Sequence, residues 1–160
     1  MTTIHLFDVG SPVPVTTEAR GEVAVKQALS LEDGDALVLI DDSDLDVDFA
    51  NVDITQTVAD LAKGSPGLVL LRNPLGRVTA NVSYAGSLAT IHVHAATRIR
   101  RVRRLAIREL GLDDATAADT SIRLAGSEED MPPNRPIGAY LAKGEHKIAL
   151  DLVHRVRAQG

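Results

Sequence analysis

Apolar and polar residues alternate in several short segments of the chain, a period of two that is typical of β-strands with one buried face. In the first half this alternation predicts strands over 3–9, 13–17 and 36–40, and a last strand that ends at Leu71. Residues 22–31, between the second and third strands, have the spacing of an amphipathic helix. The first half is therefore expected to run strand, strand, helix, strand, strand.

The same order of elements recurs in the second half. Strands are predicted over 78–84, 89–95 and 121–125, and a helix over 98–110. That helix has an apolar stripe formed by Ile99, Val102, Ala106 and Leu110, with Leu105 beside it. Gly111 is the expected end of the helix, because a left-handed residue is favoured there. In the final strand one face is formed by Ile148, Leu150 and Leu152.

An internal repeat relates the two halves. Leu-Ala-Lys-Gly occurs at 61–64 and again at 141–144, and each copy leads through a turn into the last strand of its half. A period of about 80 residues is too long for a solenoid unit and indicates a duplicated small domain. We expect an α+β fold with a mixed sheet and one covering helix in each copy. The expected bounds are 1–73 and 78–154 for the domains, 74–77 for the linker and 155–160 for a tail.

Composition adds what the core and the site can contain. Hydrophobic residues make up 44% of the 160 residues, with two Phe, two Tyr and no Trp, so the core is expected to be aliphatic. The absence of cysteine excludes disulfides, thiolate metal sites and a cysteine nucleophile. No apolar run is long enough to span a membrane and no signal peptide is recognisable, so we expect a soluble cytoplasmic protein.

The charge is distributed unevenly. Residues 1–75 hold 13 acidic and four basic residues, a net of −9, whereas residues 76–160 carry a net of +4. A basic helix face is expected from Arg100, Arg101, Arg103, Arg104 and Arg108. Such a patch suits phosphate binding, but the acidic first half would repel a duplex and aromatic residues are scarce. A solvated face, or one paired with the acidic domain, is the preferred interpretation.

Metal and catalytic sites are not expected. Residues 41–53 place acids at alternating positions, as a calcium loop does, but Val47 stands where that loop needs glycine and Asp53 where it needs glutamate. His92 and His94 share a strand face without an identifiable third ligand. No serine lies in a nucleophile elbow and no glycine-rich loop joins a strand to a helix. The chain is expected to be neither an enzyme nor a cofactor-binding protein.

Residues 121–160 resemble the second half of ubiquitin. A strand ends at Ala125-Gly126, a one-turn segment follows at 136–141, and a tight turn at Lys143-Gly144 leads into the final strand and an Arg-Val-Arg tail. The resemblance covers 78–160 and, more weakly, 3–72. Two tandem ubiquitin-like β-grasp domains are similar to the vertebrate interferon-induced two-domain modifier and to the BilA family of bacterial antiphage operons. The composition, rich in arginine, alanine and aspartate, favours the bacterial family.

This resemblance implies a modifier joined through Gly160 to target proteins, phage structural proteins among them. The implied partners are an activating enzyme that uses ATP, a conjugating enzyme and a deconjugating protease. The tail residues that these enzymes would recognise are Arg155, Val156, Arg157, Ala158 and Gln159. Only one terminal glycine is present where ubiquitin has two, which implies enzymes with a wider channel.

Two further positions follow from the resemblance. Arg123 occupies the position of the central hydrophobic recognition residue of ubiquitin, so ordinary ubiquitin receptors should be repelled. Tyr140 corresponds to the buried tyrosine of ubiquitin. Two other functions remain open at this point: a non-covalent adaptor with an inert tail, and a sulfur carrier ending in a thiocarboxylate. A duplicated domain and Gln159 both argue against the sulfur carrier.

Overall fold

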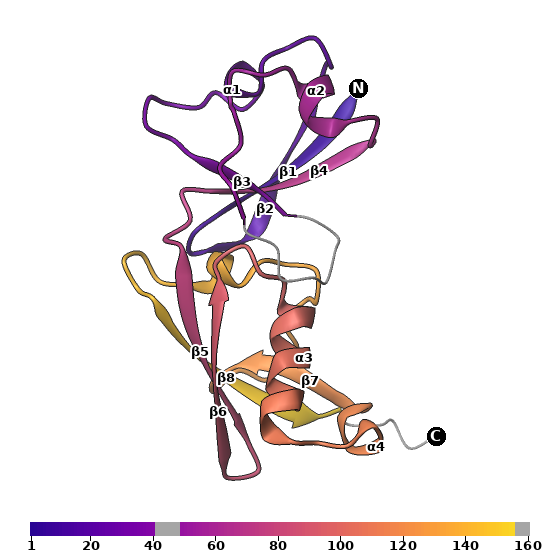
Figure 1. Cartoon of the computed structure of the whole chain (residues 1–160), viewed down its shortest axis with the longest axis vertical. Helices are drawn as coiled ribbons and strands as arrows, with labels where there is room; N and C mark the ends of the chain where they lie inside the picture. Colours follow the sequence, from indigo (N-terminus) through magenta and orange to yellow (C-terminus); the bar gives the residue numbers. More distant parts are fainter. Residues whose placement is uncertain (41–48, 156–160) are drawn as a thin grey trace.

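A computed structural model of the chain describes residues 1–40 and 49–155, and its strands form two four-stranded sheets (Figure 1). The first sheet has the order β2-β1-β4-β3, with β1 (Thr2–Asp8), β2 (Ser11–Ala19), β3 (Leu37–Leu39) and β4 (Gly67–Arg72). The second has the order β6-β5-β8-β7, with β5 (Arg77–Tyr84), β6 (Ser87–His94), β7 (Thr120–Leu124) and β8 (Lys147–His154).

The two sheets have the same topology. In each, the first and last strands of the domain lie parallel in the middle, as β1 with β4 and β5 with β8. The other two strands pair antiparallel on the outside of this central pair. The prediction of an α+β fold with two tandem ubiquitin-like β-grasp domains is confirmed.

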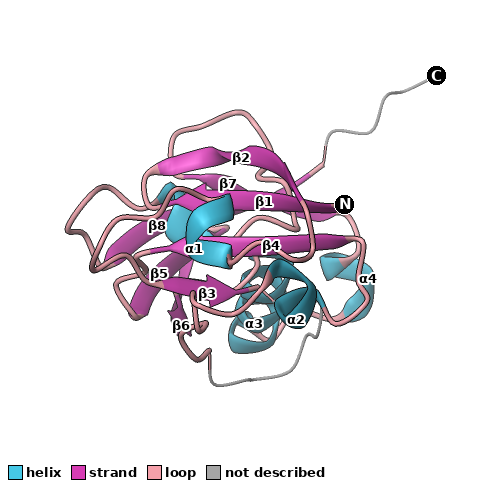
Figure 2. Cartoon of the chain, turned by 90° about the horizontal axis from the view of Figure 1, so that it is seen from above, coloured by secondary structure: helices cyan, strands magenta, loops and turns pink. Residues whose placement is uncertain are grey.

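The helix predicted in the second domain is present as α3 (Ile99–Leu110). Gly111 ends it with a φ of +67°, in the left-handed region that favours glycine. Ile99, Val102 and Ala106 are buried as expected, whereas Leu110 is only half-buried. A short helix α4 (Asp114–Ala117) and a one-turn 3-10 helix η1 (Ile137–Tyr140) complete this domain. In the view of Figure 2, α2, α3 and α4 gather on one side of the strands.

The helix predicted over 22–31 is wrong in length. The structure has only α1 (Val25–Ala28) there, followed by α2 (Val58–Ala62) before β4. Ala24 is extended and bridges Thr57, and the Val25 N–H donates to the Gln56 carbonyl at 2.9 Å. These pairings with a distant segment replace the first helical turn. Ser30, with a φ of +51°, ends the segment, so only one turn remains.

Two clusters of buried side chains stabilise the protein. The first lies inside the first domain and includes Ile4, Leu37 and Leu70. The second fills the second domain and includes Ile148, Leu150 and Leu152, the strand face that the alternation predicted. Both are aliphatic apart from Phe7 and Met131, as the composition indicated.

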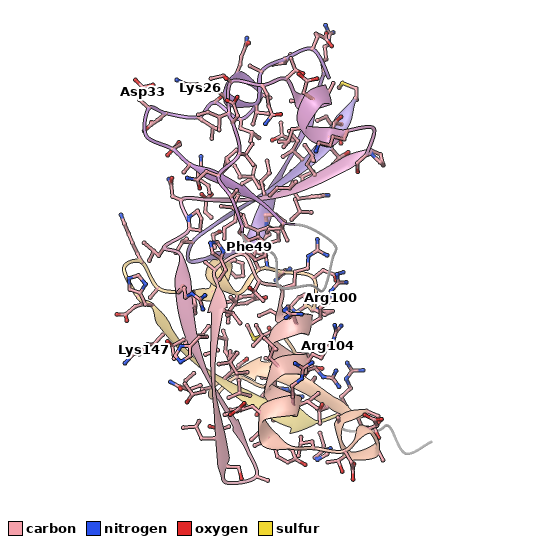
Figure 3. All side chains as sticks on the ribbon, viewed as in Figure 1. Lys26, Asp33, Phe49, Arg100, Arg104 and Lys147 are labelled. Atoms are coloured by element: carbon pink, nitrogen blue, oxygen red, sulfur yellow. The ribbon has the colours of Figure 1, made fainter. Side chains whose placement is uncertain are left out.

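The second cluster also contains side chains of the first domain. Phe7, Val38, Ile40 and Leu71 are buried in it, although their sequence neighbours Leu6, Leu37 and Leu70 belong to the first cluster. Because side chains of a strand alternate between faces, part of the outer face of the first sheet is buried as well, on β1, β3 and β4. Its outer face packs on the second domain, where β1 and β2 contact η1. Phe49 lies at this junction (Figure 3).

The connection between the domains is hydrogen-bonded at both ends. Asn73 exchanges backbone and side-chain hydrogen bonds with Ala36, and its amide donates to Asp35 at 2.9 Å. At the other end the Ala95 N–H donates to the Gly76 carbonyl at 2.8 Å. The linker is therefore fixed to each domain. Within residues 1–40 and 49–155, no helix combines the length and apolar character that crossing a bilayer requires.

Candidate functional site

The last strand, β8, comes directly before the C-terminal residues of the chain. β8 is an inner strand, paired with β5 on one side and β7 on the other, and His154 is opposite Thr120. One residue further on, the Arg155 N–H donates to the Asp119 carbonyl at 2.7 Å. The ladder of hydrogen bonds therefore continues past the end of the strand, as far as Arg155.

The side chain of His154 is held from the other side of β8. Its Nε2 lies 2.8 Å from the hydroxyl of Tyr84, at the end of β5. The two rings meet edge to face, with centroids 5.5 Å apart and an interplanar angle of 63°. The residues before the C-terminal segment are thus fixed by backbone contacts on the β7 side and by a side-chain contact on the β5 side.

Charged side chains near the end of β8 influence one another electrostatically. Hydrogen bonds from Arg123 and Ser121 lower the pKa of the Asp130 carboxyl, and the charges of Arg123 and Arg155 add to that effect. Burial lowers the pKa of the Arg103 guanidinium, and Arg155 and Arg104 lower it further by repulsion. The exposed Arg155 is therefore in electrostatic reach of both Asp130 and Arg103.

The outer face of the second sheet carries polar side chains near the end of β7. Arg123 lies on this face opposite Asp151, and its Nε donates to Asp130 Oδ1 at 2.8 Å. Ser121 Oγ donates to the same oxygen at 2.8 Å. The structure thus supplies the carboxylate that the charge of Arg123 needs, and its correspondence to the recognition residue of ubiquitin stays a prediction.

Arg103 does not belong to the solvent-facing arginines, which corrects the sequence interpretation of the basic helix. Its Nη2 donates to the Ala117 carbonyl at 2.6 Å and its Nε to the Thr120 carbonyl at 3.1 Å. It therefore joins α3 to α4 and to the start of β7. Arg104 and Arg108 are exposed, whereas Arg100 and Arg101 are half-buried. In Figure 3, Arg100 and Arg104 extend from the same side of α3.

Replacing Arg103 by methionine is expected to lower the free energy of unfolding by about 1–3 kcal/mol, because two carbonyl groups lose a charged donor. Arg108→Met, on the exposed side of the same helix, should cost no more than about 0.5 kcal/mol. Urea unfolding followed by circular dichroism compares the two variants. Equal losses would contradict the bridging role of Arg103.

The two histidines considered as metal ligands have other contacts. His92 Nδ1 lies 3.2 Å from the Thr79 hydroxyl, and His94 Nδ1 accepts from the Ala96 N–H at 3.0 Å. The His94 ring also stacks on Phe49, with centroids 4.8 Å apart. In the described ranges, histidine and acidic side chains do not gather in threes as a metal ion would require. Most of the acidic stretch 41–53 lies outside those ranges, and Asp53 accepts hydrogen bonds from Thr55.

His94 should make stability dependent on pH. Burial, with repulsion from Arg77, holds the pKa of His94 below its ordinary value of 6.5. The unfolded state therefore binds a proton more readily, so stability is full above about pH 6.5 and falls as the pH drops toward the folded-state pKa. We expect the urea midpoint to decrease between about pH 7.5 and pH 5.5. His94→Asn keeps an acceptor for Ala96 and should have a flatter profile. An unchanged slope would contradict the assignment.

Most of the predicted tail lies outside the described residues. This applies to Val156, Arg157, Ala158, Gln159 and Gly160, so their role in conjugation stays a prediction. Arg155 is described, exposed, and placed at the end of the sheet. Tyr140 is half-buried, and its hydroxyl lies 3.4 Å from Arg135 Nη1.

The contact between Tyr84 and His154 was not predicted. The two residues are 70 positions apart, and only the parallel register of β5 and β8 brings them together. Tyr84 ends β5 and His154 ends β8, so the contact could have been predicted only with knowledge of the register of these strands.

Comparison with known proteins assigns the second domain. Residues 79–155 match the family described as BilA ubiquitin-like domain 2. No curated protein matches the chain. The matched region begins in β5 and ends at Arg155, the residue bonded to Asp119. The match supports a BilA-like ubiquitin-like protein, and a ubiquitin-like domain is typical of a modifier rather than an enzyme.

Proposed function

We propose that this chain is a ubiquitin-like modifier that is joined through Gly160 to lysine amines of target proteins. A cognate activating enzyme would adenylate the Gly160 carboxylate with ATP, so the chain itself needs no cofactor. A cysteine of that enzyme and then of a conjugating enzyme would carry the carboxylate as a thioester, until a target amine displaces the sulfur. A protease would reverse the attachment.

The match of residues 79–155 to BilA ubiquitin-like domain 2 carries this proposal. The order of elements agrees with it, because residues 155–160 follow β8 directly along the chain. A carboxylate that must enter the active sites of successive enzymes needs a narrow, extended segment, and glycine has no side chain to obstruct such a channel. Arg155 and Arg157 can bind acidic grooves of the partners.

The setting we propose is the bacterial cytoplasm during defence against phage, with phage structural proteins among the targets. The resemblance to the modifiers of antiphage operons and the arginine-rich composition support this part of the proposal. Arg123, which is bonded to Asp130, supports the use of dedicated partners, because the resemblance to ubiquitin implies an arginine at a position where ubiquitin receptors require an apolar side chain.

Mass spectrometry of tryptic peptides tests the proposal. The chain is expressed with its activating and conjugating enzymes, beside a Gly160-deleted variant. Trypsin cuts after Arg157, so a modified lysine should retain an Ala-Gln-Gly remnant. We expect this remnant only with the intact chain, and more of it when the protease is inactivated.

The alternatives predict different results. An adaptor would leave no remnant, and its partners would co-purify equally well with the Gly160-deleted chain. A sulfur carrier would leave no remnant either, but its intact mass would increase by the difference between sulfur and oxygen. Either result would overturn the proposal of a covalent modifier.

A further inference from the structure

The end of β8 is held more firmly than pairing within the sheet requires. Arg155 lies beyond the strand, yet its N–H donates to the Asp119 carbonyl at 2.7 Å. His154 is exposed, yet its Nε2 contacts the Tyr84 hydroxyl at 2.8 Å. Strand ends at a domain surface usually fray, because few contacts hold them. Here contacts from both sides act on two consecutive residues.

We propose that Tyr84, acting through His154, is a positioning residue that fixes where the C-terminal segment begins. This inference rests on the proposed function, since it concerns how the Gly160 carboxylate is presented to the partner enzymes. Tyr84 holds His154 from β5, and the Asp119 carbonyl holds Arg155 from the other side. The segment presented to a partner is then residues 156–160.

The contact is suited to a permanent anchor. A tyrosine hydroxyl both donates and accepts, so it can donate to a neutral imidazole Nε2 or accept from a protonated one. The bond is therefore available in both protonation states of His154. The edge-to-face packing of the rings adds an interaction that does not involve the hydroxyl. Tyr84 thus holds His154 by two kinds of contact, the hydrogen bond and the ring packing.

The anchor limits how far the carboxylate can reach. An extended chain spans at most about 3.3–3.6 Å per residue, so residues 156–160 reach at most about 18 Å from Arg155. While the second domain is bound to the surface of a partner, the carboxylate can reach a catalytic centre that lies no further than this distance from Arg155. If His154 and Arg155 were not held, they would have to become ordered again on binding, which would lower the affinity.

The first test measures the anchor without any partner. Tyr84→Phe removes only the hydroxyl, and Tyr140→Phe is a matched control, since its hydroxyl contacts Arg135 and not the end of β8. We expect Tyr84→Phe to accelerate hydrogen exchange of the Arg155 amide roughly two- to tenfold, as loss of one hydrogen bond implies. Tyr140→Phe should leave that rate unchanged. An equal rate in Tyr84→Phe and the wild type would overturn the anchor.

The second test measures presentation to the partner. Thioester formation on the activating enzyme is followed with each variant as substrate. We expect Tyr84→Phe to raise KM several-fold with kcat unchanged, because the ordering of His154 and Arg155 affects binding and not the chemical step. A role confined to folding stability would lower the unfolding midpoint without moving KM. Equal KM values for both variants would therefore overturn the positioning role.

The two tests also separate this inference from the proposed function. If the wild-type chain forms no thioester, the proposed function fails, and the positioning role in conjugation fails with it. The exchange rate of the Arg155 amide would still show whether Tyr84 holds the end of β8. If thioester forms and the exchange rates are equal, the proposed function stands and the anchor alone is wrong.

Discussion

Replacing Leu71 by aspartate is expected to separate the two domains and to lower the free energy of unfolding by about 3–5 kcal/mol, the typical cost of an unpaired buried charge. Leu71 is fully buried and faces the second domain, while the preceding Leu70 faces the core of the first. The side chains of this cluster are apolar, so they do not solvate or neutralise a carboxylate at this position. Separation of the domains avoids burying it and exposes Phe7 and Val38 instead.

Urea unfolding and small-angle scattering measure this effect. The wild-type chain should unfold in one transition, because the domains share a buried cluster. Leu71→Asp should give two transitions and a larger radius of gyration. Leu88→Asp is the matched control, since Leu88 is 62% exposed on β6. A single transition at an unchanged midpoint in Leu71→Asp would show that the two domains do not stabilise each other.

Gly138→Ala is expected to cost about 2–3 kcal/mol, within the range for overpacked sites. A Cβ at this position would lie 2.8 Å from the Ala95 carbonyl oxygen and 3.2 Å from Cδ2 of Leu71. Moving away is not free, because the Gly138 N–H donates to that same carbonyl at 2.7 Å. The added methyl group would therefore clash with Ala95 in the same domain and with Leu71 of the first domain.

The control for this substitution is Gly67→Ala. Gly67 also lacks a positive φ, and its Cβ would meet only the Thr3 carbonyl oxygen, at an ordinary 3.6 Å. We expect the urea midpoint of Gly67→Ala to stay close to that of the wild type, within about 0.5 kcal/mol. If both variants lost the same stability, close packing at Gly138 would not be the cause.

The periodic parts of the fold were predictable from the sequence. The alternation of Ile148, Leu150 and Leu152, the stripe around Val102 and the end of α3 at Gly111 are local patterns, and the structure confirms them. The helix predicted over 22–31 is too long because the N–H groups of Val25 and Lys26 donate to carbonyl groups of residues 54–56, which are distant in sequence. Local propensity does not contain that information.

The sequence predicted where along the chain the candidate site lies, but not which side chains contact one another there. That β8 would lead into the tail followed from the order of elements, but the contact of Tyr84 with His154 depends on the register of two distant strands. Arg103 was assigned to solvent because helical spacing places it beside Arg104. Its carbonyl partners belong to α4 and the start of β7, which the sequence did not place near it.

The partial burial of the outer face of the first sheet has a consequence for valency. A tandem of two like domains could bind a receptor twice and gain avidity, provided that both recognition faces are accessible. In this chain the outer face of the first sheet is covered at Phe7, Val38 and Leu71, so among the described residues only the second domain offers this face without such cover. A receptor that recognises the outer face of the sheet would therefore bind each molecule at one site. Avidity would have to come from several copies attached to one target.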